Sequence, residues 1–435
     1  MALARSAATF GGITMISRVT GYVRDVLCAA FLGAGPLSDA FFLAMRLPSF
    51  FNHILTEGAF NSAFIPLFSS ALARDGKDAA HRLAQTIFNW ITFILIIFVV
   101  VMIVFMPQAL DVIAPGFKAT PEHYDRVVTL ARIMFPFTAF TIFVAFMGCI
   151  LNVFDKFAAV AFTPILMNIL MSAGIFLGYY VFQDVVHALA ISYTLAGFMQ
   201  FLMMLYLLRR LGFSLTLRLP HHDPIIKKFF FLLLPTTIGV GAVQINSLVN
   251  TWFASYMDGG ALSYLFYADR LTLFPLGVIG VALSTVLLPT LTRALAQHDA
   301  HTTQDAQNRA IELGMFLTVP SAVALFILAH PIVSVLFERG AFTPSDALQT
   351  SHALQAMIIG LPAYVLIKIL TVRFFADKNT KTPLKIALLC VGTNIVFNII
   401  FRKHLQYVGI ALSLSLCAWL NVTLLLWKLS SKKCL

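Results

Sequence analysis

The most constraining feature of the sequence is a succession of apolar runs that are long enough to cross a lipid bilayer. A spanning helix needs about 20 apolar residues, and about twelve runs of that kind follow one another along the chain. Only 11% of the 435 residues are charged, whereas a soluble domain carries about 25%. The sequence therefore predicts an all-α polytopic membrane protein with spans near 9–33, 38–72, 84–106, 127–152, 158–181, 186–208, 229–256, 261–292, 310–330, 346–375, 384–401 and 406–428.

The loops between these runs differ in charge on the two sides of the predicted membrane. When alternate loops are assigned to opposite sides, one side collects most of the lysines and arginines. The other side holds five, namely Lys118, Arg126, Arg339, Arg402 and Lys403. The positive-inside rule then predicts that both termini are cytoplasmic. This distribution accounts for the net charge of +11, so we expect membrane lipids as partners and no nucleic acid.

The two halves of the sequence resemble each other. Arg46 recurs as Arg270 and Pro107 as Pro331, each 224 residues later. A nearly constant offset over several elements indicates an internal repeat, and an even number of spans in each half makes the repeat parallel. Transporters built in this way place their substrate between two lobes that rock against each other. The polar segment 209–228 separates the halves, so we expect two six-helix lobes at 1–215 and 216–435.

Several charged residues lie inside the apolar runs rather than in loops. A centrally placed arginine costs about 2.5–3.5 kcal/mol on insertion scales, so these residues must face a wet cavity or one another. Arginine also binds phosphate oxygens with two nitrogens and keeps its charge. The pattern indicates a polar, anionic substrate and a cationic cavity. The residues are Arg18, Arg24, Arg46, Arg132, Arg270 and Lys368, accompanied by Asp25, Asp39, Glu57 and Asp269.

Helical spacing groups some of these residues. Arg18 and Asp25 are seven residues apart, as are Asp39 and Arg46, which is two turns of a helix and places each pair on one face. Ser263 precedes Arg270 by the same interval in the second half. Arg132 and Lys368 lie near span ends, where a long side chain reaches the interface.

The sequence offers no competing chemical site. Its histidines lack metal-ligand spacing with a carboxylate on the same helix face, and there is no P-loop that would indicate an ATP-driven pump. We therefore expect no catalytic residue, no metal and no cofactor. The driving force stays open between the membrane potential and a monovalent cation. Asn246, Asn250, Asn394 and Asn398 are neutral, and asparagines in a helical bundle usually hydrogen-bond between helices.

Long motifs resemble those of the MurJ/MviN lipid II flippases, which belong to the multidrug/oligosaccharidyl-lipid/polysaccharide exporter superfamily. They are SRVTGYVRD (17–25), SDAFFLAMRLP (38–48), EGAFNSAFIP (57–66), APGF (114–117), FYADRLTLFPLGVIGVALSTVLLP (266–289) and KTPLKIA (381–387).

The resemblance implies the substrate and the site. Lipid II, the undecaprenyl-pyrophosphate-linked peptidoglycan precursor, would move from the cytoplasmic to the periplasmic leaflet of the bacterial inner membrane by alternating access. Cell-wall synthesis proteins would be the further partners. The family's cavity residues match here at Ser17, Arg18, Arg24, Asp25, Asp39, Glu57, Ser263 and Arg270. Outside this match, we expect a secondary set of site residues at Arg46, Asn52, His53, Asp269 and Lys368.

Two departures from the family pattern stand out. Asn52-His53 occupies the place of an arginine pair, so one cavity cation is lost or supplied by protonated His53. Family members usually have 14 helices, of which the last two line a groove for the lipid tail, and we expect those two to be absent here. Two alternative functions remain. One is a related exporter of drugs or other lipid-linked oligosaccharides, and the other is a membrane glycosyltransferase acting on prenyl-linked sugars.

Overall fold

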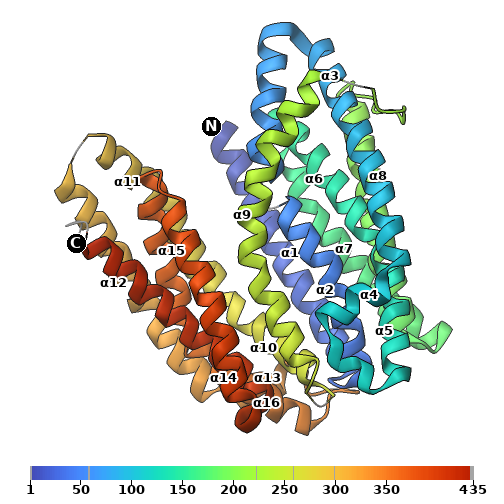
Figure 1. Ribbon diagram of the computed structural model, residues 1–435, viewed down its shortest axis with the longest axis vertical. Helices are drawn as coiled ribbons and strands as arrows, with labels where there is room; N and C mark the ends of the chain where they lie inside the picture. The colour runs from blue at the N-terminus through green and yellow to red at the C-terminus, as the bar shows by residue number, and fades with distance from the viewer. Residues whose placement is uncertain (1, 57–58, 222, 258, 298, 432–435) are drawn as a thin grey trace. The chain divides into compact units, whose positions relative to one another are not determined.

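The computed structural model describes residues 2–56, 59–221, 223–257, 259–297 and 299–431, and over these residues its regular structure is entirely helical. This confirms the predicted all-α class. The helices, shown in Figure 1, are α1 (Ala2–Leu32), α2 (Pro36–Thr56), α3 (Ala59–Val104), α4 (Met106–Ile113), η1 (Pro115–Ala119), α5 (Pro121–Met134), α6 (Phe137–Val153), α7 (Phe157–Leu177), η2 (Gly178–Phe182), α8 (Val185–Arg210), α9 (Pro224–Ala254), α10 (Ala261–Pro275), η3 (Leu276–Gly280), α11 (Val281–Ala296), α12 (Ala300–Ile327), α13 (Ala329–Phe337), α14 (Pro344–Ile358), α15 (Leu361–Ala376) and α16 (Lys381–Ser431).

Eight helical segments of the described residues are long and apolar enough to cross a membrane. Two of them each cover two of the expected spans, namely Pro36–Val104 and Lys381–Ser430. The longer helices inside these segments are broken at Gly76 and Gln406, whose backbone angles are not helical. Helices α1 and α9, of 31 residues each, cover the two remaining expected spans. A polytopic membrane protein is therefore confirmed.

The chain forms two compact units. Unit 1 comprises residues 1–32 and 36–244, and unit 2 comprises residues 33–35 and 245–435. The division thus falls inside α9, beyond the boundary expected at 215/216. The beginning of α9 belongs to unit 1 because Phe229 is fully buried in the same core cluster as Phe64. The central cavity expected between the lobes stays a prediction.

The order of helices in the first half recurs in the second. Helix α5 begins at Pro121 and α14 at Pro344, 223 residues later. Left-handed residues recur at the same interval, since Gln183 ends η2 with φ of 55° and its counterpart Gln406 has φ of 47°. Two chance sequence matches would not reproduce helix starts and turn conformations together. The internal repeat inferred from the sequence is therefore present in the helix order.

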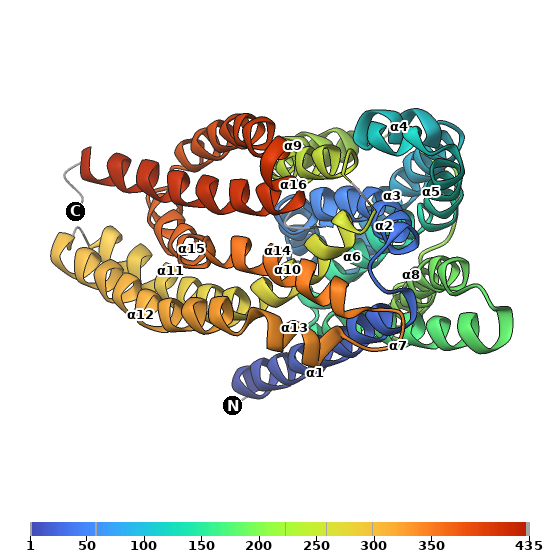
Figure 2. The same cartoon turned by 90° about the horizontal axis from the view of Figure 1, so that it is seen from below.

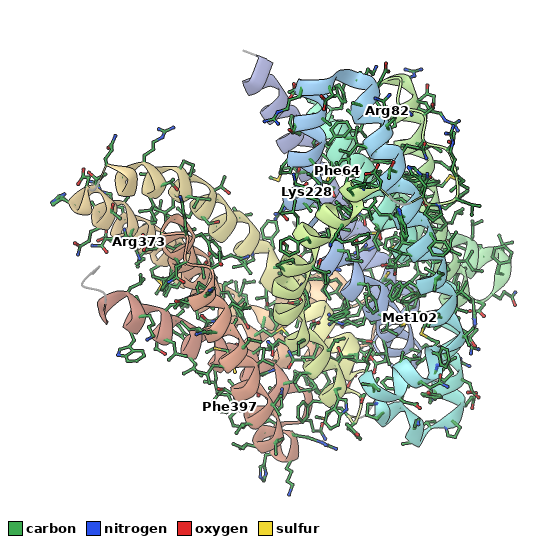
Figure 3. The ribbon with its side chains drawn as sticks, turned by 45° about the horizontal axis from the view of Figure 1, so that its top comes forward. Phe64, Arg82, Met102, Lys228, Arg373 and Phe397 are labelled. Atoms are coloured by element: carbon green, nitrogen blue, oxygen red, sulfur yellow. The ribbon has the colours of Figure 1, made fainter. Side chains whose placement is uncertain are left out.

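The core of unit 1 is rich in phenylalanine. Phe64, Phe68 and Phe146 are fully buried there, and the ring centroids of Phe64 and Phe146 lie 4.8 Å apart. Figure 3 labels Phe64 within this unit and shows Arg82 and Met102 toward opposite ends of the second part of α3. These close contacts between buried rings pack α3 and α6 tightly against each other.

Candidate functional site

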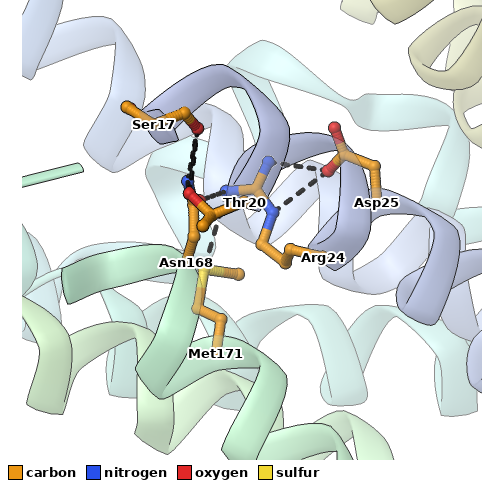
Figure 4. Close-up of polar contacts among 6 residues, drawn as sticks. All are labelled: Ser17, Thr20, Arg24, Asp25, Asn168 and Met171. Atoms are coloured by element: carbon orange, nitrogen blue, oxygen red, sulfur yellow. Dashed lines mark hydrogen bonds and ion pairs between the residues drawn. The ribbon is translucent and has the colours of Figure 1, made fainter. Parts of the chain in front are cut away.

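A buried polar cluster joins α1 to α7 in unit 1. The two helices lie side by side in both ribbon views (Figures 1 and 2). Arg24 of α1 is 7% exposed and donates hydrogen bonds to the carboxylate of its neighbour Asp25, from Nε at 3.0 Å and from Nη2 at 2.6 Å. Its Nη1 donates to Oδ1 of Asn168 on α7 at 3.0 Å (Figure 4). Burial of an arginine in this region is thus offset by a carboxylate and an amide.

Asn168 links several groups of α1. Its Nδ2 donates to the carbonyl of Ser17 and to Oγ1 of Thr20, each at 3.2 Å, while its Oδ1 accepts from Arg24. Gly21 permits this approach, because a Cβ there would lie 3.3 Å from the Asn168 amide nitrogen. Sequence reasoning missed Asn168, since a single asparagine in an apolar run gives no signal of its own.

Arg18 differs from Arg24 in its surroundings. The side chain of Arg18 is exposed, whereas Arg24 and Asp25 are buried. The structure therefore brings Arg24 and Asp25 together, and it separates Arg18 from the pair although Arg18 and Asp25 have a two-turn spacing. Hydrogen bonds between adjacent residues account for this, because they turn the Asp25 carboxylate toward Arg24. An exposed guanidinium on α1 keeps its nitrogens available for a ligand.

The α2 residues expected at the site span a range of burial. Asp39, in the first turn of the helix, is 3% exposed, Arg46 and Asn52 are half-buried, and His53 is exposed. Glu57 lies outside the described residues. The exposure of these side chains therefore increases along α2, from the buried Asp39 through the half-buried Arg46 to the exposed His53.

Unit 2 presents the expected residues of the second half. Ser263 on α10 is fully buried, and the half-buried Arg270 places its guanidinium carbon 4.7 Å from the centroid of the Phe266 ring. Asp269 and Lys368 are exposed. A cation held over an aromatic face is attracted to the ring and is oriented by it.

Four asparagines form an amide cluster between α9 and α16 in unit 2. Nδ2 of Asn394 donates to Oδ1 of Asn246 and of Asn250, each at 2.8 Å, and Nδ2 of Asn398 donates to Oδ1 of Asn250 at 3.2 Å. Asn394 is fully buried. The expectation that these asparagines hydrogen-bond between helices is confirmed. Within the described ranges, no group of three or more histidine, cysteine or acidic residues could hold a metal ion.

Arg132 follows a different pattern. Its side chain is exposed and its Nε donates to the carbonyl of Ile103 in α3 at 3.0 Å. Asp111 of α4 lies outside the candidate spans. Lys118 and Tyr124 both donate to its carboxylate, at 2.8 Å and 2.5 Å. The hydrogen bond from Lys118, followed by that from Tyr124, holds the pKa of Asp111 below its ordinary value. These contacts fix the loop between α4 and α5.

Comparison with known proteins finds one family over nearly the whole chain. The family model described as lipid II flippase MurJ matches residues 28–434. A probable lipid II flippase MurJ of Rhizobium meliloti is 39% identical over 98% of this chain and 80% of its own length. A lipid II flippase MurJ of Burkholderia cenocepacia is 33% identical over 98% of this chain and 83% of its own.

Solved structures show the same relationship. The inward closed conformation of a lipid II flippase MurJ is similar with a TM-score of 0.86 and 29% identity, covering 97% of this chain and 87% of that one. An inward-facing multidrug resistance transporter of the MATE family has a TM-score of 0.79 at 16% identity, over 98% of this chain and 99% of that one. At that identity the second comparison concerns the fold alone.

Proposed function

The chain belongs to the lipid II flippase MurJ family, and from this premise we propose that it moves lipid II from the cytoplasmic to the periplasmic leaflet of the bacterial inner membrane. The observation that carries the proposal is the family match over residues 28–434. Lipid II is thereby the substrate, and the protein acts as a transporter rather than as a catalyst. The drug exporter is disfavoured further, because drug exporters prefer cations whereas this chain carries arginines within its spans.

The arginines are the groups that we assign to the pyrophosphate. Unit 1 supplies Arg18 and Arg24, and unit 2 supplies Arg270. Guanidinium groups suit this role because each binds two phosphate oxygens at once and stays charged. Arg18 is exposed, so its guanidinium is accessible to a headgroup. Ser17, Asp25, Asp39, Glu57 and Ser263 complete the assigned set.

In our proposal, Arg24 exchanges partners when it binds a phosphate with two nitrogens. In this structure its Nε, Nη1 and Nη2 all donate to Asp25 or Asn168. A phosphate that takes over the two-nitrogen contact would replace the Asp25 carboxylate, and one that binds Nη1 would compete with the Asn168 amide. Replacement of the Asn168 amide would remove a hydrogen bond between α1 and α7, which would link headgroup binding to a movement within unit 1. Alternating access by the two lobes is the transport cycle that we propose.

The driving force belongs to the same proposal. Coupling to the membrane potential or to a monovalent cation needs no cofactor in the protein. The amide cluster at Asn394 offers neutral oxygen ligands, which suit a monovalent cation, while the in-span arginines carry charge that a potential acts on. Cell-wall synthesis proteins are the partners that would consume the translocated substrate.

The proposed orientation places both termini and the 209–228 segment in the cytoplasm. The test is labelling of cysteines introduced at Ser214 and Ser430, both exposed, in a background without the native cysteines. Impermeant reagents added to intact spheroplasts should leave both positions unlabelled, and permeabilisation should expose both. Labelling of either position before permeabilisation would contradict the orientation.

Complementation tests the transport function. The gene is expressed in a strain depleted of its own lipid II flippase, with membrane abundance measured for each variant. Wild type should restore growth and cell shape. Rescue by the wild type together with failure of Arg18→Ala and Arg24→Ala at equal abundance supports the proposal. If the wild type, Arg18→Ala and Arg24→Ala all restored growth of the depleted strain, the two arginines would have a structural role and would not bind the headgroup.

A further inference from the structure

An apolar groove lies on unit 1, and one arginine is part of its lining. It is lined by α3, α6, α8 and the segment after α8, and its volume is about 660 Å³. That volume lies in the range of pockets that hold drug-sized ligands. Its lining is Phe88, Thr92, Leu95, Ile96, Val99, Val100, Pro136, Ala139, Phe140, Phe143, Phe201, Leu205, Arg209, Leu215, Thr216 and Leu217.

The segment that closes one end of this groove is fixed on α3 by side-chain hydrogen bonds. The side-chain amide of Gln85 makes two hydrogen bonds to the backbone of Thr216. Its Nε2 donates to the Thr216 carbonyl at 2.5 Å, and its Oε1 accepts from the Thr216 amide at 2.9 Å. Oδ1 of Asn89 accepts from the amide of Arg218 at 3.3 Å, and Nε1 of Trp90 donates to the carbonyl of His221 at 3.0 Å. The end of the groove is therefore preformed.

Alternation along this extended segment separates apolar from polar surface. Leu215 and Leu217 line the groove, while Ser214 and Arg218 line a polar hollow of about 680 Å³. Thr216 contributes to both. Such alternation follows from the two-residue period of extended chain. An amphipathic molecule would find apolar walls on one side of Thr216 and polar groups on the other.

Arg209 gives the groove its charge preference. Among the described residues that line the groove, it is the one that carries a charge, and it lies in the last turn of α8. The neighbouring Arg210 is placed differently, with its guanidinium carbon 4.8 Å from the centroid of the Tyr206 ring and outside the lining. A guanidinium at the end of an apolar channel matches a phosphate attached to an acyl chain.

We propose that this groove binds a glycerophospholipid, with one acyl chain along α3, α6 and α8 and its phosphate at the Arg209 guanidinium. The leaflet is the one at the C-terminal end of α8, which is cytoplasmic in the orientation proposed above. A negative lipid surface attracts basic residues at that depth. The site belongs to unit 1 alone and differs from the arginines assigned to the transported headgroup.

The test uses the purified full-length protein in liposomes that contain phosphatidylglycerol with a photoreactive group in its acyl chain. Peptide mapping after irradiation should find the adduct on the peptides that contain Val99, Ala139 and Leu205. Arg209→Gln should lower the adduct yield about tenfold, as loss of a charge-assisted hydrogen bond predicts. Arg210→Gln, the matched control with the same change of charge, should leave the yield unchanged. Ala139→Trp, which fills the groove, should abolish the adduct while the melting temperature shows a folded protein.

Three results would overturn the proposal. Equal yields for Arg209→Gln and Arg210→Gln would show that the arginine in the lining does not select the lipid. Adducts spread evenly over the membrane face, unaffected by Ala139→Trp, would indicate ordinary solvation by lipid. Displacement of the adduct by a small excess of a polyprenyl phosphate, but not by phosphatidylglycerol without the photoreactive group, would assign the groove to a prenyl lipid instead.

Discussion

Replacing Asp25 by asparagine removes the negative charge that Arg24 binds with two of its nitrogens. Arg24 is 7% exposed and Asp25 is 4% exposed. The hydrogen bonds to the carboxylate are 3.0 Å long from Nε and 2.6 Å long from Nη2. Breaking a buried ion pair from one side costs about 3–5 kcal/mol, because it leaves an uncompensated charge. Asn168 still accepts one hydrogen bond from Arg24, so we expect a loss of about 3 kcal/mol, near the lower end of that range.

Thermal unfolding of the purified protein in detergent measures this loss, and a double variant separates stability from transport. Replacing both members of a buried pair by neutral side chains is often nearly neutral, so Arg24→Met/Asp25→Asn should melt close to wild type. The same double variant should fail to complement, because it lacks the arginine assigned to the pyrophosphate. An Asp25→Asn protein that melts like wild type would refute the reasoning about burial. A double variant that complements fully would refute the assignment of Arg24.

Three further predictions follow from separate contacts. Arg18→Lys should reduce complementation because lysine lacks the planar two-nitrogen contact, whereas Arg132→Lys, at a residue that bonds the backbone of α3, should change it little. Asn394→Ala should cost about 1 kcal/mol in thermal unfolding through its two lost interhelical bonds, and Thr393→Ala, which loses a bond within its own helix, is the control. At neutral pH the ionised Asp111 carboxylate should stabilise the α4–α5 loop through its contacts with Lys118 and Tyr124. This stabilisation should be lost as the pH falls from the ordinary Asp value of 3.8 through the lowered pKa of Asp111, because the carboxylate then binds a proton. Hydrogen exchange of that loop, corrected for its intrinsic pH dependence, measures it, and Asp111→Asn should remove the pH dependence.

The spans and the internal repeat could be predicted from sequence because each depends on a long pattern. Apolar runs identify helices that lipid must surround, and matched prolines and arginines identified a repeat that the helix order reproduces. The unit boundary was harder to place. It falls inside α9 because Phe229 packs in the core of unit 1, a tertiary contact that the polar composition of 209–228 does not reveal.

The sequence was enough to predict which charged residues belong to the candidate site. It was not enough to predict which residues they contact. The cost of burying arginine identified Arg18 and Arg24 without structural information. An ideal helix then paired Arg18 with Asp25, whereas the structure pairs Asp25 with its neighbour Arg24. Asn168 escaped notice because its role depends on how α7 approaches α1 at Gly21. Spacing along one helix cannot predict a contact that a second helix provides.

Translocation of lipid II in liposomes tests the central claim most directly. Purified wild-type protein is reconstituted with lipid II, and an impermeant enzyme outside the vesicles modifies the headgroups that become accessible over time, with a potential of either sign and with sodium or potassium present. Under at least one of these conditions, accessibility should rise faster than in protein-free vesicles and in vesicles with the Arg24→Met/Asp25→Asn variant. Equal rates in all three preparations under every condition, with folded wild-type protein confirmed by its melting temperature, would contradict the account.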